Sequence, residues 1–240
     1  MRILLITAIL CGRCIGGYAQ QVVDVDAQDF NGTNHQTVEN AVNGLMLQPY
    51  KYVRVTDGTP YFNKEYMKAR LFDGAGTSYA SNAVRLNLLD NEVDFKDAAG
   101  NELVATTPVK QIQLTDTTTG TKYLFVKGDQ IPEAGADESN TWLQVLVNDK
   151  VSLLRKTRKS IRETIPYGTS TTEEQIVSLD SYFVRMNKTF THVKNWQEIL
   201  QLFSDKKEAV ESFARSHHLK GKSESDYTQL VRYYNSLPTP

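Results

Sequence analysis

The sequence predicts an α+β fold: an antiparallel, curved or partly closed β-sheet followed by three short C-terminal helices. Two observations support this prediction. Between residues 49 and 194, short runs rich in β-branched and aromatic residues alternate with Asp-Gly, Asp-Asn and Asn-Asp pairs, a pattern typical of antiparallel hairpins. Between residues 195 and 240, apolar residues recur at helical spacing behind capping residues.

The first 19 residues predict a secretory signal peptide. Arg2 precedes an uncharged run over residues 3–12, and the small residues Gly17 and Ala19 stand just before Gln20. The run is shorter than the roughly 20 residues that a membrane span needs. We therefore expect an exported protein in the periplasm, at the outer membrane or secreted. The alternative is an apolar N-terminal strand of a protein that is not exported.

Removal of this segment changes the chemistry of the chain. It takes away both cysteines, Cys11 and Cys14, so the mature chain forms neither a disulfide nor a cysteine-ligated metal site. It leaves 25 basic against 28 acidic residues, a net charge near −3, which argues against a nucleic-acid partner. No later stretch is apolar enough for a transmembrane span.

Residues 20–48 are polar and predict a leader or linker, and the β-rich body follows at residues 49–194. The segment "GAGTSYASN", residues 74–82, is predicted as a loop. Two strands are expected within residues 176–193, with a corner at Met186-Asn187-Lys188. The preceding strands are predicted at residues 50–55, 67–72, 83–89, 92–95, 109–114, 123–126, 142–147 and 150–154.

An acidic stretch, "RLNLLDNEVDFKD" at residues 85–97, raises the question of a metal or acid–base site. The Asp90-Asn91 pair predicts a turn, and Asp97 is expected in the next turn. Between them Asp94 alternates with apolar residues, so we expect it on the water-facing side of a strand. The spacing of a calcium-binding loop is absent.

Residues 195–240 predict a helical segment packed on the β-rich body. Asn195 and Glu198 have the spacing of a capping box. Ser204 and Ser223 are expected to cap the second and third helices. One face of the first helix is expected to carry Trp196, Ile199, Leu200 and Phe203.

The sequence lacks the common catalytic motifs. It contains no G-x-S-x-G, P-loop, G-x-G-x-x-G or H-E-x-x-H pattern. The four histidines do not have the spacing of zinc ligands on a helix, and they are His35, His192, His217 and His218. We therefore expect no cofactor and no metal.

One charge feature is uneven along the chain. Residues 150–162 carry basic side chains without an acid, and we interpret five of them as a candidate anion-binding strip: Arg155, Lys156, Arg158, Lys159 and Arg162. In a strand, Lys156, Arg158 and Arg162 share one face. Such a strip would suit lipid headgroups, phosphates or an acidic glycan. The favoured alternative is an edge strand protected by its charges, with the acidic loop 128–140 as its intramolecular counterpart.

The motif order resembles a group of uncharacterised exported proteins of Gram-negative bacteria. The resemblance covers a signal peptide, "LLDNEV" at residues 88–93, "YFV" at 182–184, "NWQEILQLFSDKK" at 195–207 and "YYNSL" at 233–237. It implies a bacterial envelope or secreted protein without an assigned catalytic residue.

These observations favour a non-enzymatic binding or interaction module of the cell envelope. A curved sheet backed by helices can enclose an apolar groove, so a carrier of lipids or lipoproteins is one version of this hypothesis. The alternative is a hydrolase of glycans or peptides that uses a pair of acidic residues, which no spacing in the sequence identifies.

Overall fold

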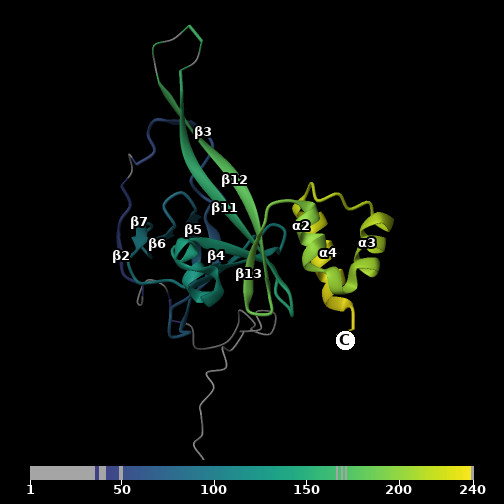
Figure 1. The fold of residues 1–240 in the computed structure, drawn as a ribbon. Helices are drawn as coiled ribbons and strands as arrows, with labels where there is room; N and C mark the ends of the chain where they lie inside the picture. The colour runs from purple at the N-terminus through teal and green to yellow at the C-terminus, as the bar shows by residue number, and fades with distance from the viewer. Residues whose placement is uncertain are drawn as a thin grey trace, which may run out of the picture. The chain divides into compact units, whose positions relative to one another are not determined.

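The computed structural model describes residues 36–37, 42–48, 51–165, 167–168, 170 and 172–238 (Figure 1). All of them belong to one unit, residues 35–240. The predicted signal peptide and most of the predicted leader lie outside the described residues. Three leader residues, Gly44–Met46, form a β-strand that pairs with residues 103–105.

Thirteen strands of the described residues form one open sheet. Their order is β13-β12-β11-β10-β9-β8-β4-β5-β6-β7-β2, with β1 beside β5 and β3 beside β12. The strands are β1 (Gln36–Thr37), β2 (Gly44–Met46), β3 (Val55–Asp57), β4 (Met67–Phe72), β5 (Ser78–Asn87), β6 (Glu92–Lys96), β7 (Glu102–Ala105), β8 (Gln111–Thr115), β9 (Lys122–Lys127), β10 (Trp142–Val147), β11 (Ser152–Thr164), β12 (Glu173–Met186) and β13 (Thr189–Val193).

The sheet is mixed, whereas the sequence predicts an antiparallel one. Neighbours along the main order pair antiparallel. However, β1 pairs in parallel with β5, and β3 in parallel with β12. No short hairpin turn joins either strand to its partner, so turn chemistry does not constrain their direction. The prediction of a β-rich body is confirmed, and the prediction of uniform antiparallel pairing is wrong for these two strands.

The predicted strands agree with the structure where Asp, Asn or Gly residues mark the turn between them. β4 and β10 have the predicted bounds, and the corner before β13 has the expected positive φ at Asn187 and Lys188. By contrast, β5 starts at Ser78 inside the predicted loop 74–82. The turn between β4 and β5 is tight, because the Asp73 carboxylate accepts hydrogen bonds from the backbone of Ala75 and Thr77 at 2.9 Å. Residues 51–54 form a turn rather than a strand, and β7 has no counterpart among the predicted strands.

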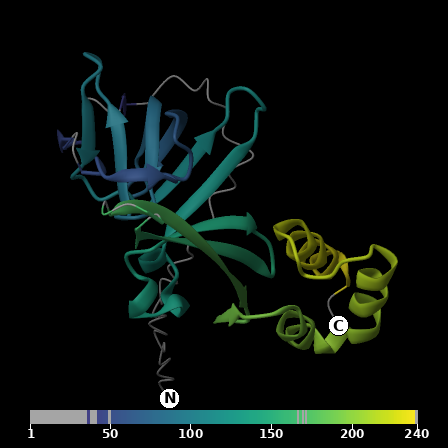
Figure 2. The same cartoon turned by 90° about the horizontal axis from the view of Figure 1, so that it is seen from above.

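Three helices follow the sheet, as predicted: α2 (Trp196–Leu202), α3 (Lys207–Ser216) and α4 (Glu224–Ser236) (Figure 2). Asn235 of α4 donates to the Val151 carbonyl at 2.8 Å and accepts from the Val151 amide at 2.9 Å. One apolar cluster joins the helices to the sheet, and it includes Leu153, Val184, Val193, Ile199, Phe203, Val210, Leu230 and Val231. A second cluster fills the core around β4, β5, β6 and β8.

Two of the three predicted helix caps are confirmed. The Asn195 side chain accepts from the Glu198 amide at 3.1 Å, and the Ser223 hydroxyl accepts from the Asp226 amide at 3.2 Å. Ser204 is not a cap of α3, because it opens a separate 3-10 turn and α3 starts at Lys207 without a side-chain cap.

Replacing Asn195 with alanine is expected to destabilise the protein by about 1 kcal/mol, because the Glu198 amide loses its acceptor. Urea unfolding measures this change. Gln197→Ala, on an exposed position of the same helix, serves as the control and is expected to change the midpoint little. Equal effects of the two substitutions would show that the cap does not stabilise α2.

Candidate functional site

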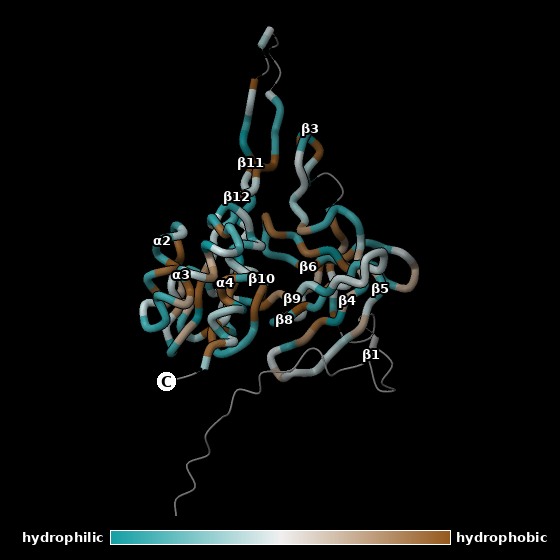
Figure 3. Tube along the Cα trace, turned by 90° about the vertical axis from the view of Figure 1, so that its right-hand side faces the viewer, coloured by the Kyte–Doolittle hydropathy of each residue, from teal (hydrophilic) through white to brown (hydrophobic). Residues whose placement is uncertain are grey.

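β11 and β12 form a long hairpin, which Figures 1 and 3 show as two adjacent strands. They pair continuously from Ser152 opposite Arg185 to Thr164 opposite Glu173. Residues 153–155 of β11 also pair with β10. Within the described part of the chain, residues 156–164 pair with β12 alone, so this half of the hairpin is a ribbon with a free β11 edge.

The strand register divides the side chains of the ribbon between two faces. Directly opposed residues of an antiparallel pair project from the same side. The Arg162 guanidinium accordingly donates to the Gln175 side chain at 3.3 Å. We define the open face by three such pairs: Arg158 with Leu179, Ser160 with Val177, and Arg162 with Gln175.

The opposite face of the ribbon contacts residues 54–59, which we call the strap. The strap contains β3 and pairs in parallel with β12 at Glu174 and Gln175. Lys159 projects from this face and donates to the Thr59 carbonyl at 2.8 Å. At Gly58, a Cβ atom would lie only 2.2 Å from the carbonyl oxygen of Ile176. The strap therefore packs directly on the backbone of the hairpin.

Three of the five predicted strip residues have partners within the protein. Arg155 Nη1 lies 2.6 Å from Glu224 Oε2, and Lys156 Nζ lies 2.7 Å from Glu138 Oε2. Lys159 donates to the strap. The prediction that the acidic loop 128–140 supplies a counter-charge is confirmed by the pair between Lys156 and Glu138. These three cations stabilise the fold and are not free for a ligand.

The other two strip residues, Arg158 and Arg162, are exposed on the open face. Among the described residues the Arg158 side chain has no ion pair or hydrogen bond, and the Arg162 side chain donates a hydrogen bond to neutral Gln175. Glu173, the carboxylate of this face, lies at its far end opposite Thr164. The open face therefore presents two cationic guanidinium groups to solvent.

Large apolar side chains are exposed on the same hairpin. Leu179, opposite Arg158, is 57% exposed, and Ile161 on the other face is 45% exposed. At the far end, Ile165 is 66% exposed and Tyr167 is fully exposed. Edge protection by charge accounts for the arginines but not for these exposed apolar side chains. No sequence pattern identified Leu179. Alternating polar and apolar residues predict a strand, but they do not predict which of its faces other segments of the chain leave exposed.

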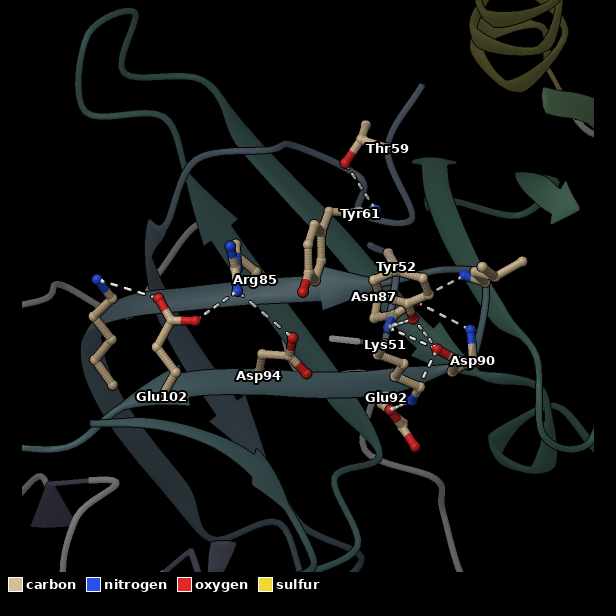
Figure 4. A network of polar contacts seen from close by, with 12 residues as sticks. Lys51, Tyr52, Thr59, Tyr61, Arg85, Asn87, Asp90, Glu92, Asp94 and Glu102 are labelled. Carbon is tan, nitrogen blue, oxygen red and sulfur yellow. Dashed lines mark hydrogen bonds and ion pairs between the residues drawn. The ribbon is translucent and has the colours of Figure 1, made fainter. Parts of the chain in front are cut away.

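A second polar cluster lies within the sheet (Figure 4). Asp94 of β6 is completely buried, so the prediction that it faces water is wrong. Its neighbour across the strands is Arg85, whose Nη2 lies 3.9 Å from Asp94 Oδ2. The Arg85 guanidinium lies 4.1 Å from the ring centre of Tyr61 and 4.0 Å from that of Tyr66. The chain segment that carries these tyrosines covers the face of β6 that contains Asp94, which the alternation of polar and apolar residues assigns to solvent.

Burial controls the electrostatics of Asp94. It raises the pKa of this carboxyl to about 6, and the Tyr61 hydroxyl and the Arg85 guanidinium only partly offset the effect. Within the described residues neither carboxylate oxygen accepts a hydrogen bond of standard geometry. Arg85 also lies 3.4 Å from Glu102. A carboxylate sealed from solvent cannot exchange a proton with a substrate, so this cluster gives no support to the hydrolase hypothesis.

The Asp90 carboxylate belongs to a turn, as predicted. It accepts hydrogen bonds from the Tyr52 hydroxyl and, at 3.0 Å, from the Asn87 amide (Figure 4). Lys51 lies 3.0 Å from the same carboxylate, and Asn91 has the positive φ of a tight turn. Asp97 likewise accepts from the backbone and side chain of Asn101. These carboxylates stabilise turns.

The described residues contain no group of three or more His, Cys, Asp or Glu side chains placed to hold a metal ion. None of the helices that the structure describes is both long and apolar enough to cross a membrane. No protein-family model, no curated protein and no solved structure matches the chain.

Proposed function

We propose that this protein is an exported, non-enzymatic binding module that contacts anionic lipid surfaces through the β11–β12 hairpin. One observation supports the proposal: the hairpin exposes arginine and large apolar side chains on one ribbon. Arg158 stands opposite Leu179 on the open face, and Ile165 and Tyr167 are exposed at the far end.

The mixture of side chains favours lipid over other anions. Guanidinium groups bind phosphates through paired hydrogen bonds. Aliphatic side chains gain free energy by leaving water, and tyrosine suits the boundary between headgroups and acyl chains. An acidic glycan would satisfy the arginines but leave Leu179 and Ile165 in water. A carrier would need a deep apolar cavity, and the two pockets described, of about 340 and 120 Å³, both have charged side chains in their linings.

We also propose that the protein is exported and that its sheet is curved. Thirteen twisted strands in one open order are expected to curl, since strongly twisted open sheets rarely exceed about 10 strands without doing so. Likeness to exported proteins of Gram-negative bacteria is the basis for placing the protein in the envelope. Mass spectrometry of the protein from its native host tests this part: an N-terminus at Gln20 supports export, and retention of Met1 contradicts it.

Binding to vesicles tests the lipid contact. The protein is expected to sediment with phosphatidylcholine vesicles that contain phosphatidylglycerol, and far less with phosphatidylcholine alone. Arg158→Ser with Arg162→Ser is expected to weaken binding by more than tenfold, since each basic residue near an anionic surface contributes about 1 kcal/mol. Leu179→Ser with Ile165→Ser is expected to weaken binding further in the same assay.

A matched control lies at the other end of the sheet order, on β2. Leu45 and Met46 are 68% and 61% exposed, so Leu45→Ser with Met46→Ser removes exposed apolar groups of similar size. These substitutions are expected to leave vesicle binding unchanged. Equal loss in this variant, equal binding to neutral vesicles, or binding to heparin without binding to vesicles would each contradict the proposal.

A further inference from the structure

A pocket of about 340 Å³ opens where three connecting segments meet. Its walls come from the β5–β6 turn at Asn91, from the end of β7 and the connection to β8 at residues 105–109, and from Ser139 and Asn140 before β10. The volume lies within the range of about 300–1,000 Å³ typical of small-molecule sites. The pocket is independent of the β11–β12 hairpin.

Lys127 is a structural support of this pocket. Its ammonium group donates to the Asn91 carbonyl, the Asn140 carbonyl and the Asn140 side-chain oxygen, each at 3.0 Å. All three N–H donors are therefore in use. Burial lowers the pKa of Lys127 to about 8. Because three acceptors hold the nitrogen, it is neither a free cation nor an accessible nucleophile.

The remaining charged groups around the pocket are also paired. Lys110 binds the Asp129 carboxylate, and Glu92 Oε2 lies 2.9 Å from Lys51 Nζ. An ionic ligand would have to displace one of these partners, and breaking an existing pair leaves a charge without compensation. The charges therefore favour an uncharged ligand.

Several polar groups of the pocket retain unused hydrogen-bonding capacity. Because Lys127 binds the Asn140 oxygen, the amide nitrogen of Asn140 is oriented away from it with two donors. Within the described residues, neither this nitrogen nor the Thr106 hydroxyl nor the Asn91 side chain has a hydrogen-bond partner. Uncharged donors and acceptors thus surround the opening.

Buried apolar side chains complete the lining: Val93, Val109 and Trp142. Apolar walls with a few convergent polar groups are the usual composition of a small-molecule site. We propose that this pocket binds a small, uncharged, polyhydroxylated molecule of about the size of a monosaccharide. The hydroxyl groups of such a ligand pair with Asn140, Thr106 and Asn91, and its carbon skeleton lies against the apolar side chains.

The two tryptophans of the chain provide a reporter and a control. Trp142 lines the pocket, and its indole N–H donates to the Asn91 carbonyl at 3.3 Å, whereas Trp196 lies in α2. In proton–nitrogen correlation spectra of the whole protein, glucose or N-acetylglucosamine is expected to shift the Trp142 indole signal saturably and to leave Trp196 unchanged. No saturable shift with either sugar, or a tighter response to glucuronate than to glucose, would overturn the proposal.

Two substitutions remove donors with little change in shape. Asn140→Asp keeps the oxygen that holds Lys127 but loses both amide donors, and Thr106→Val loses a hydroxyl. Each is expected to weaken the apparent affinity about fivefold. Asn148→Asp makes the first change at an exposed position after β10 and is expected to have no effect. Unchanged affinity in both pocket variants, or an equal loss in Asn148→Asp, would refute the assignment.

Discussion

Replacing Asp94 with asparagine is expected to stabilise the protein at pH 7 by roughly 2–3 kcal/mol and to change its stability little at pH 4. The reason is burial of a carboxylate that the Tyr61 hydroxyl and the Arg85 guanidinium only partly compensate. Burial raises the pKa of the Asp94 carboxyl from its ordinary value of 3.8 to about 6. At about 1.36 kcal/mol for each pKa unit, ionisation of the buried group costs the folded state about 3 kcal/mol.

The pH dependence follows from linkage. Between about pH 4 and pH 6 the folded state holds a proton on Asp94 that the unfolded state has lost, so this group makes stability fall as pH rises. Above pH 6 the penalty is complete. The asparagine side chain of the variant carries no charge at any pH, so the stability difference between variant and parent is expected to grow across this window and then remain constant.

Chemical unfolding from pH 4 to pH 8 measures the difference. Asp97→Asn is the control, for which the expected change in stability at pH 7 has the opposite sign. Hydrogen bonds from Asn101 lower the pKa of Asp97, so its ionised form stabilises the fold, and the substitution is expected to cost stability at pH 7. If Asp94→Asn were destabilising at pH 7, the Arg85 guanidinium would outweigh burial, and the pKa of Asp94 would lie below its ordinary value.

Replacing Gly58 with alanine is expected to cost at least about 3 kcal/mol. Gly58 has a φ of +84°, and a left-handed conformation costs an ordinary residue about 1–2 kcal/mol. In addition, the new Cβ would lie 2.2 Å from the Ile176 carbonyl oxygen, so the strap must move away from β12. That movement breaks the contact of Lys159 with the Thr59 carbonyl.

Gly76→Ala separates the two causes. Gly76 has nearly the same φ, +81°, but no atom lies within 4 Å of the added Cβ. Its substitution therefore measures the conformational cost alone. Thermal unfolding is expected to show a larger loss of stability for Gly58→Ala than for Gly76→Ala. The Glu174 amide donates to the Arg54 carbonyl in the strap, so its hydrogen exchange is expected to be faster in Gly58→Ala. Equal losses in the two variants would show that the strap does not depend on close packing at Gly58.

Turns and caps are the features that local sequence predicts well in this protein. The Asp90-Asn91 turn, the corner at Asn187 and the cap at Asn195 depend on side chains that bind their own neighbouring backbone or tolerate positive φ. Ser204 shows the limit of the same reasoning. It has the right residue type, but a 3-10 turn intervenes before α3.

The candidate site could be predicted only in part. The basic strip lies in one strand, as expected, and Lys156 finds its partner in the acidic loop. Which cations remain free depends on contacts distant in sequence. Glu224 of α4 pairs with Arg155, and Thr59 of the strap accepts from Lys159, which leaves Arg158 and Arg162. The exposure of Leu179 likewise depends on which distant segments contact the hairpin.

The amino-acid sequence alone determined the β-rich body, the tight turns within it and the three closing helices, because alternation and capping are local properties of a chain. Only the tertiary structure decided that β1 and β3 join the sheet in parallel, that Asp94 is buried and that one face of the hairpin stays open. Each of these depends on which remote segment covers a surface. Tyr61 and Tyr66 cover the Asp94 face, and nothing described covers Arg158.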